Sequence, residues 1–287
     1  MPSSLSTVTQ SALRAPDLKL AACVRGYISR NTLGAELLPS QRLNHFPASV
    51  YVTLNWHLVG TVDLAWMGDE EVVPQGHVGM SFSGPRTVPF CARNPGPVHT
   101  FSVVLMPDAV QAITGLEMGP WVNRVQPLHQ VLDLEWQAMA QAVQNAVDDA
   151  QRIALVEQFL WPRWQKVRHQ TVSQVDQVSA WVQALLIRAA TSGLGQSVRQ
   201  MERRVKIWAG LSKRELRSLA RAEAGFIQAQ AERASGADAS FADLAALTGY
   251  ADQAHLSRIT RKVTGLSPSE LMRAIHEEES YWSYRLF

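Results

Sequence analysis

The spacing of hydrophobic residues changes once along the chain. Val50 to Leu58 alternate between hydrophobic and polar side chains, which predicts a half-buried strand. Residues 61–67, 78–82 and 101–105 look like further strands separated by Gly and Pro, whereas residues 1–44 carry only weak signals. Many short strands divided in this way favour a small barrel or sandwich.

From about Val131 the hydrophobic positions follow a helical spacing. Residues 131–164 predict a helical hairpin that closes the first domain. We place a linker at the polar stretch 166–175, so that residues 1–165 form one domain and residues 176–287 another. The expected fold class is α+β, with a β-rich N-terminal domain that includes the hairpin, followed by an all-helical domain.

A sequence repeat lies inside the helical half. The stretch 203–216 recurs 55 residues later as 258–271, and six of the fourteen positions are identical. Each copy has a basic helix, a glycine that stops it (Gly210 or Gly265), and a serine with a glutamate three residues on, which is the signature of a capped helix start. Such a repeat indicates one supersecondary unit used twice.

Charge is distributed unevenly between the two halves. Residues 163–287 hold 18 Lys and Arg against 12 Asp and Glu, a charge of +6, and residues 1–162 carry −4. A basic half is typical of a protein that binds a polyanion such as DNA.

The two cysteines exclude a disulfide framework and a four-cysteine zinc site. The chain shows neither an apolar run of ~18–20 residues, as a membrane span requires, nor a secretion signal. We therefore expect a cytoplasmic protein with no membrane partner.

The run from Gly249 to Arg258, Gly-Tyr-Ala-Asp-Gln-Ala-His-Leu-Ser-Arg, is the most specific motif. Together with residues 264–268 and the earlier stretch 197–205, it resembles the DNA-binding domain of AraC/XylS-type transcriptional regulators. The resemblance covers about residues 175–275. It implies two helix-turn-helix units whose recognition helices enter successive major grooves, ~34 Å apart.

The resemblance also implies which side chains contact DNA. The residues expected to contact bases are Arg199, Glu202 and Arg203 in the first unit and Gln253, Ala254, Ser257 and Arg258 in the second. The residues expected to contact phosphates are Lys206, Arg214, Arg261 and Lys262.

The sequence departs from this family at two places. Thr260 stands where the family usually has a large apolar residue, and residues 191–196 occupy much of the space where a short first helix would precede the first recognition helix. We therefore expect looser packing of the second recognition helix and an irregular first unit.

The N-terminal half is similar, by position and by its order of strands then helices, to the cupin-like sensory domain of such regulators. The resemblance implies a transcriptional regulator that is not an enzyme, with promoter DNA as a partner and an effector of unknown identity. We expect a homodimer, because paired recognition raises the effective concentration on DNA, with the 131–164 hairpin as the candidate interface, and we leave contact with RNA polymerase open. We expect no catalytic residues, no cofactor and no metal.

Two other functions compete with this interpretation. A cupin-like metal-dependent enzyme with an accessory helical domain would use the histidines of the β half, but these lack the spacing of a preorganised metal site. An adaptor would bind protein through its helical half. The four histidines of the β half are His45, His57, His77 and His99.

Several residues of the β half could line an effector site. Arg86 and Arg93, in the loop-like stretch 83–96, could pair with an acidic effector or belong to a solvated loop. Four aromatic residues could line a pocket or pack in the core, namely Trp56, Trp66, Phe82 and Trp121.

Overall fold

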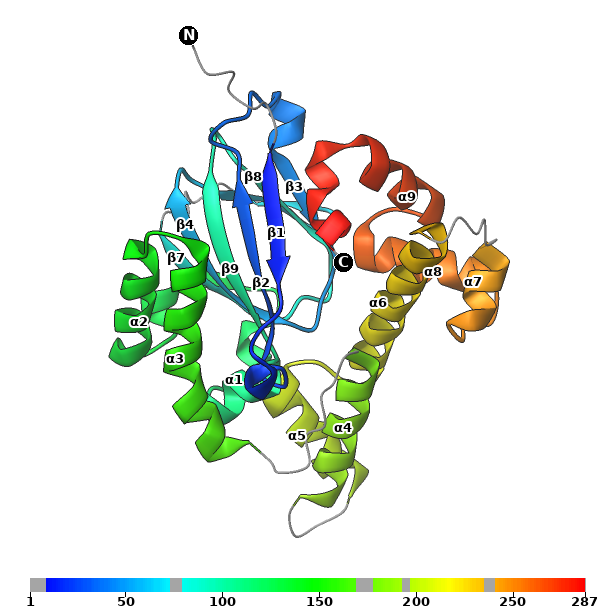
Figure 1. Ribbon diagram of the computed structural model, residues 1–287. Coiled ribbons are helices and arrows are strands. Elements are labelled where there is room, and N and C mark those ends of the chain that lie inside the picture. Colours follow the sequence, from blue (N-terminus) through cyan, green and yellow to red (C-terminus); the bar gives the residue numbers. More distant parts are fainter. Residues whose placement is uncertain (1–8, 73–78, 169–177, 193–196, 235–240, 287) are drawn as a thin grey trace.

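Two antiparallel sheets form the N-terminal half of the protein, as a computed structural model shows for residues 9–72, 79–168, 178–192, 197–234 and 241–286. The larger sheet has the strand order β1-β2-β9-β4-β7-β10 and the smaller one β3-β8-β5-β6 (Figure 1). The strands are β1 Gln10–Arg14, β2 Val24–Asn31, β3 Leu43–Phe46, β4 Val52–Val59, β5 Asp63–Met67, β6 Glu70–Glu71, β7 Met80–Ser83, β8 Phe90–Arg93, β9 His99–Leu105 and β10 Val125–Pro127.

The other regular elements of the described chain are helices. The α-helices are α1 Pro107–Thr114, α2 Leu134–Asn145, α3 Asp149–Val167, α4 Val178–Thr191, α5 Val198–Ala209, α6 Lys213–Ala234, α7 Phe241–Leu247, α8 Gln253–Thr264 and α9 Pro268–Glu277. Short 3₁₀ segments lie at Leu18–Leu20 (η1), Pro39–Arg42 (η2), Gly119–Trp121 (η3), Leu128–Gln130 (η4) and Glu279–Leu286 (η5). This order of a β-rich region, a hairpin and a helical region confirms the α+β fold class.

The alternating pattern places its apolar side chains in the core. Val52, Leu54 and Trp56 of β4 are almost completely buried, and β4 pairs with β9 so that Trp56 lies opposite Phe101. Trp56 and Phe82 are therefore core residues.

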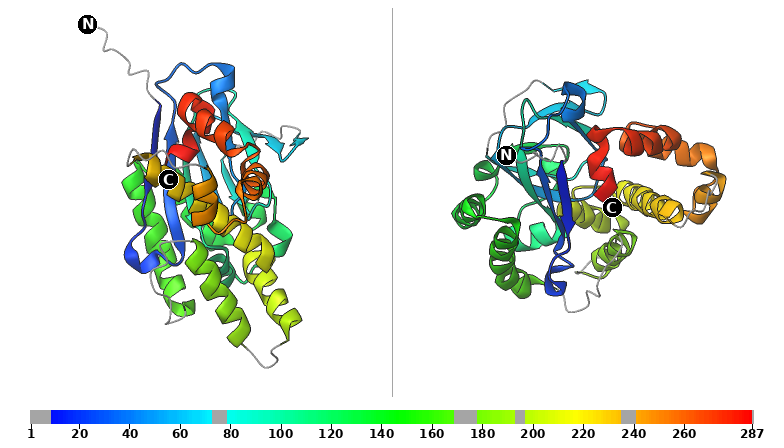
Figure 2. Two further views of the ribbon diagram at one scale, coloured as in Figure 1. Left: turned by 90° about the vertical axis from the view of Figure 1, so that its right-hand side faces the viewer. Right: turned by 45° about the horizontal axis from the view of Figure 1, so that its top comes forward.

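Helices cover the sheets on two sides (Figures 1 and 2). The hairpin of α2 and α3 lies on one side, and α6 to α9 lie on the other. Trp136 of α2 and Leu160 of α3 lie on the apolar face of the hairpin and pack in the same core as the strands. That core continues into α4, α5 and the start of α6, so the two halves of the chain share one hydrophobic interior.

The proposed linker 166–175 is described only at its start. α3 continues through Lys166 and Val167, Arg168 caps it, and residues 169–175 lie outside the described residues.

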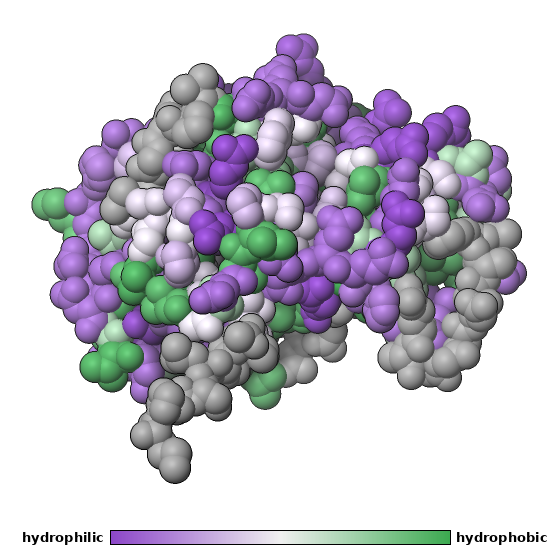
Figure 3. Space-filling model, turned by 90° about the horizontal axis from the view of Figure 1, so that it is seen from above, coloured by the Kyte–Doolittle hydropathy of each residue, from purple (hydrophilic) through white to green (hydrophobic). Residues whose placement is uncertain are grey.

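Within the part of the chain that the structure describes, no helix combines the length and apolar character needed to cross a bilayer. The face seen from above in Figure 3 is mostly hydrophilic, with small scattered hydrophobic patches.

Candidate nucleic-acid interface

Two helices, α5 and α8, are built in the same way. Ser197 accepts a hydrogen bond from the backbone N–H of Gln200 and starts α5, and Asp252 accepts one from His255 and starts α8. α5 ends at Gly210 and α8 at Gly265, both in the left-handed conformation that glycine adopts without strain. The sequence repeat is therefore a structural repeat.

The helix that follows each of them is capped alike. Ser212 and Glu215 exchange hydrogen bonds at the start of α6, and Ser267 and Glu270 do so at the start of α9. The predicted capping boxes are thus confirmed. They fix the exit direction of the chain after both basic helices.

Each basic helix buries one face and exposes the other. Val205 and Ala209 anchor α5, and Leu256 and Val263 anchor α8. Ten of the eleven residues expected to contact DNA are exposed to solvent, and Ser257 is half-buried. Lysine and arginine side chains on an exposed helix face are free to approach phosphates and base edges. Among these residues, Arg261 forms an exposed ion pair with Glu270 at 3.4 Å.

Each basic helix is preceded by a helix packed against it. α7 precedes α8 through a turn in which Gly249 has a φ of 71° and Tyr250 is buried. α4 precedes α5 and contacts both α5 and α6. The first unit thus has a regular helix of 14 residues ahead of its recognition helix, although residues 193–196 between them lie outside the described residues.

The helix α6 separates the two units. It has 22 residues, and at 1.5 Å rise per residue it is about 33 Å long. α8 packs alongside it, since Leu256 lies in a cluster with Ala229 and Val263 lies in the cluster that contains Leu219 and Ala220.

The first unit is attached to the β-rich half by polar contacts. Asp108 of α1 accepts hydrogen bonds from the indole of Trp181 at 2.9 Å and from Arg188 at 2.8 Å, both on α4. The backbone N–H of Met118 donates to the carbonyl of Ile207 in α5 at 2.9 Å. No sequence pattern identified these contacts, because each joins residues more than 70 positions apart.

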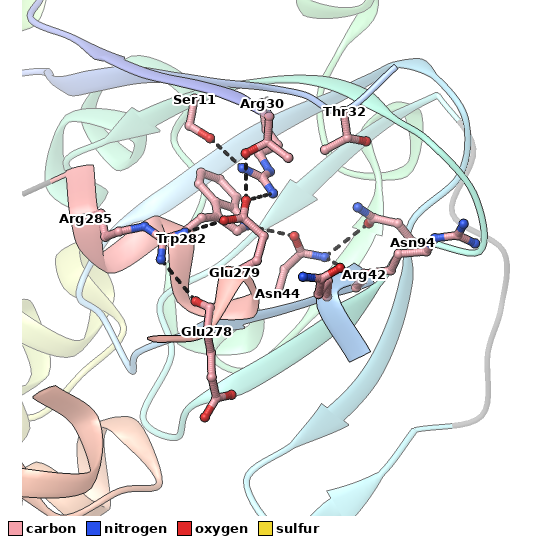
Figure 4. Close-up of polar contacts among 12 residues, drawn as sticks. Ser11, Arg30, Thr32, Arg42, Asn44, Asn94, Glu278, Glu279, Trp282 and Arg285 are labelled. Carbon is pink, nitrogen blue, oxygen red and sulfur yellow. Dashed lines mark hydrogen bonds and ion pairs between the residues drawn. The ribbon is translucent and has the colours of Figure 1, made fainter. Parts of the chain in front are cut away.

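The second unit is attached through η5, the aromatic C-terminal segment (Figure 4). Glu279 accepts a hydrogen bond from Arg30 at 2.6 Å, and the indole of Trp282 donates to Asn44 at 2.7 Å. The Arg30 guanidinium also lies over the Trp282 ring, 4.7 Å from its centre. Tyr281 and Tyr284 pack on α9, so η5 connects the second unit to strands β2 and β3.

A cavity of about 220 Å³ lies between the two halves. Its walls come from the β-rich half and from α6, α8 and α9, and they include Ile28, Val50, Val104, Phe226, Leu256 and Thr260. Arg86 lines it and is only 3% exposed, so it does not belong to a solvated loop, whereas Arg93 is exposed. Trp56, Trp66, Phe82 and Trp121 are not among the lining residues.

Those histidines of the β half that the structure describes do not gather into a ligand set. His45 stacks on Tyr281 at 4.5 Å between ring centres, and burial lowers its pKa. His77 lies outside the described residues. Across the described ranges, no group of three or more His, Cys, Asp or Glu side chains could hold a metal ion.

Residues 237–273, which contain α7 and α8, match the model of the bacterial regulatory helix-turn-helix proteins of the AraC family. This segment is an AraC-family helix-turn-helix. The second unit is therefore similar to the DNA-binding helix-turn-helix of the AraC family. The match spans less than half of the chain, and it covers the second unit with the motif from Gly249 to Arg258.

Comparison of the chain with curated proteins finds no match. Among solved structures it is similar to ToxT from Vibrio cholerae, with 9% identity, a TM-score of 0.39, and coverage of 92% of this chain and 96% of ToxT. It is similar also to a form of ToxT with an unsaturated fatty acid bound, with 11% identity, a TM-score of 0.39, and coverage of 80% and 94%. Similarity this low does not transfer a ligand or a function.

Proposed function

We propose that this protein is a sequence-specific transcriptional regulator in which α5 and α8 enter successive major grooves of promoter DNA, in the cytoplasm. The observation that carries the proposal is the pair of exposed basic helices, α5 directly before α6 and α8 packed alongside α6. Arg199, Glu202 and Arg203 of α5 would contact bases in one groove. Gln253, Ala254, Ser257 and Arg258 of α8 would contact bases in the next.

Four basic residues would anchor the protein on the DNA backbone. Lys206, Arg261 and Lys262 lie on the exposed sides of the recognition helices, and Arg214 lies in the first turn of α6. Phosphate contacts fix the register of a protein on the duplex but carry no sequence information.

Both units pack against the β-rich half, and this supports a regulatory role for that half. An effector that binds one arrangement of the halves more tightly than another would change the position of α5 relative to α8. The fit of both helices to DNA depends on that position.

The chain would act as a homodimer, and pairing two DNA-binding domains raises their effective concentration on DNA. The apolar stripe of the α2–α3 hairpin is used internally, but Leu134 and Val147 remain exposed on the hairpin. Substituting both with Ser should convert a dimer to a monomer in size-exclusion chromatography with light scattering. Contact with RNA polymerase stays a prediction.

The proposal is tested by mapping the DNA bound by the full chain and then measuring binding to the mapped fragment against a scrambled one. A protein that contacts 6–10 phosphates should lose about 10³–10⁵ in affinity from 50 to 200 mM salt. An adaptor that binds protein would show no preference between the fragments. A metal-dependent enzyme would retain a stoichiometric metal in elemental analysis of the purified chain.

A further inference from the structure

A short loop of the β-rich half, residues 122–124, lies against the end of the first basic helix. Ahead of the loop, the backbone N–H of Met118 donates to the carbonyl of Ile207 in the last turn of α5 at 2.9 Å. Within the loop, Val122 packs on the turn that follows α5, since a Cβ built on Gly210 would lie 2.9 Å from Cγ2 of Val122. The segment that contains η3 and this loop is therefore fixed to the C-terminal end of α5.

Asn123 gives the loop a defined shape. Its φ of 57° is the one positive value for a non-glycine residue among the described residues. The backbone N–H of Asn123 donates to the carbonyl of Pro85 at 2.8 Å. Its side-chain amide accepts a hydrogen bond from the N–H of Thr87 at 2.9 Å and donates one to the Thr87 hydroxyl at 2.8 Å. A backbone in this conformation persists where its surroundings enforce it, so these contacts hold the loop in place.

Arg124 follows directly and is exposed. Its backbone is fixed on both sides, because its N–H donates to the carbonyl of Trp121 at 3.1 Å and its carbonyl accepts from the N–H of Gly84 at 3.1 Å. No residue that the structure describes forms an ion pair or a hydrogen bond with its guanidinium. Arg124 is thus a cation on a fixed backbone, without a counter-ion in the described part of the chain.

Basic residues lie on both sides of the turn that the loop contacts. Lys206 lies in the last turn of α5, and Lys213 and Arg214 begin α6. Arg124 is two residues from Val122, so the Cα atoms of this pair are at most about 7 Å apart. In helix-turn-helix complexes the N-terminal residues of a recognition helix contact base edges, and in the related homeodomains the C-terminal end of this helix contacts the DNA backbone. A phosphate is therefore expected near the end of α5, where Arg124 adds a cation from the β-rich half.

We propose that Arg124 binds a DNA phosphate beside the groove that α5 enters, so that the β-rich half itself contributes to DNA affinity. The inference rests on the proposed function, which places α5 in the major groove. The planar guanidinium of arginine suits a phosphate, with which it forms paired hydrogen bonds. Because phosphates carry no sequence information, the contact adds affinity and not specificity. A shift of the β-rich half relative to α5 then changes DNA affinity directly.

The test measures binding of the full chain to DNA by fluorescence anisotropy from 50 to 200 mM salt, on the mapped promoter fragment and on a scrambled one. Arg124→Gln should weaken binding to both fragments about three- to tenfold. It should also reduce the slope of log affinity against log salt by about 0.9, the value for one phosphate contact. Arg93→Gln removes an exposed arginine from β8 in the smaller sheet and should match the wild type, which controls for the change in net charge. Equal behaviour of the two variants would overturn the proposal.

Two further variants examine how Arg124 acts. Arg124→Lys keeps the charge and should retain the salt slope. Asn123→Gly permits the same backbone conformation but removes the side-chain contacts to Thr87, so it should lower affinity in the wild type and not in an Arg124→Gln background. A loss of the same size in both backgrounds would show that Asn123 does not position Arg124. Since a phosphate contact has no sequence preference, scrambled DNA alone reports it, and its absence is distinguishable from failure of promoter recognition.

Discussion

Glu279 and Arg30 join the last segment of the chain to the second strand of the sheet, with 2.6 Å between a carboxylate oxygen and a guanidinium nitrogen. Arg30 is 3% exposed, and it also donates a hydrogen bond to the hydroxyl of Ser11 at 2.8 Å. Glu279 also accepts from Thr9 and Arg285. This network fixes η5, and with it α9, against the sheets (Figure 4).

Glu279→Gln should release η5, because it leaves the buried Arg30 without its counter-charge. Losing a charged hydrogen-bond partner costs about 1–3 kcal/mol of unfolding free energy. Urea unfolding measures the loss, and Trp282 fluorescence reports whether η5 leaves the sheet. The control is Glu277→Gln, an exposed residue two positions earlier, which should leave stability unchanged. Equal stability of the two variants would show that the Arg30 contact contributes nothing.

The same pair predicts how stability depends on pH. Burial alone would raise the pKa of Glu279, but hydrogen bonds from Arg30 and Thr9 and the charges of Arg30 and Arg285 lower it below the ordinary value of 4.5. A carboxyl group whose pKa is lower in the folded than in the unfolded chain stabilises the fold at pH values above its unfolded pKa. This contribution to the unfolding free energy disappears as the pH falls through the folded pKa.

We therefore expect the difference in unfolding free energy between the wild type and Glu279→Gln to be complete at neutral pH and to shrink below pH 4.5. Parallel urea titrations of the two proteins over that range measure it. A difference that stays constant down to acid unfolding would exclude Glu279 as the titrating group.

Local signals made the helical half predictable from sequence. Caps and stops such as Ser197, Gly210 and Asp252 act within one helical turn, so the ends of α5 and α8 follow from neighbouring residues. The strand β2 was not predicted, for an equally local reason. It buries Arg30, and its pairing with β9 shifts register between Val24 and Gly26, so its sequence does not alternate cleanly.

The relation between the two halves could not be predicted from one sequence. The apolar faces of α4 and α5 indicate burial, but they do not reveal whether the partner is another helix or a sheet. Arg86 illustrates the same limit, because a guanidinium in a Gly- and Pro-rich stretch looks solvated, whereas in the fold it is buried beside Met67 of β5 and Phe90 of β8. The expected irregularity of the first unit rested on residues 191–196, whereas the longer α4 serves as its first helix.

Asp108 offers a second test of how the halves are joined. Asp108→Asn leaves Arg188, which also lies over the ring of Trp208, without a counter-charge. Because Arg188 is partly exposed, we expect a loss of about 2–3 kcal/mol rather than the full cost of a buried pair. Urea unfolding measures it, with Glu117→Gln as the exposed control. A loss no larger than that of the control would mean that packing alone holds α4 on α1.

The two helix-ending glycines form a matched pair. Gly265 has a φ of 84°, and a Cβ there would make only an ordinary contact, 3.9 Å from Cγ of Pro89, so Gly265→Ala should cost only the left-handed conformation, about 1–2 kcal/mol. Gly210 has a φ of 76°, and a Cβ there would lie 2.9 Å from Val122 and 3.0 Å from the carbonyl oxygen of Met118. Gly210→Ala should therefore cost more. Thermal unfolding followed by circular dichroism ranks the variants, and the reverse order would contradict the packing of α5 on η3.

Arg258 and Lys262 lie one helical turn apart on the exposed face of α8, and they separate base recognition from phosphate binding. If Arg258 pairs with a guanine, Arg258→Ala should cost about 1–3 kcal/mol on the mapped promoter fragment and relax preference at one base pair. Lys262→Ala should weaken specific and scrambled DNA nearly equally and reduce the salt slope by about one. Fluorescence anisotropy titrations of both variants on both fragments distinguish the roles. If Arg258→Ala lowers affinity for the two fragments to the same extent, Arg258 is a phosphate contact, and recognition by the second unit must depend on Gln253 and Ser257.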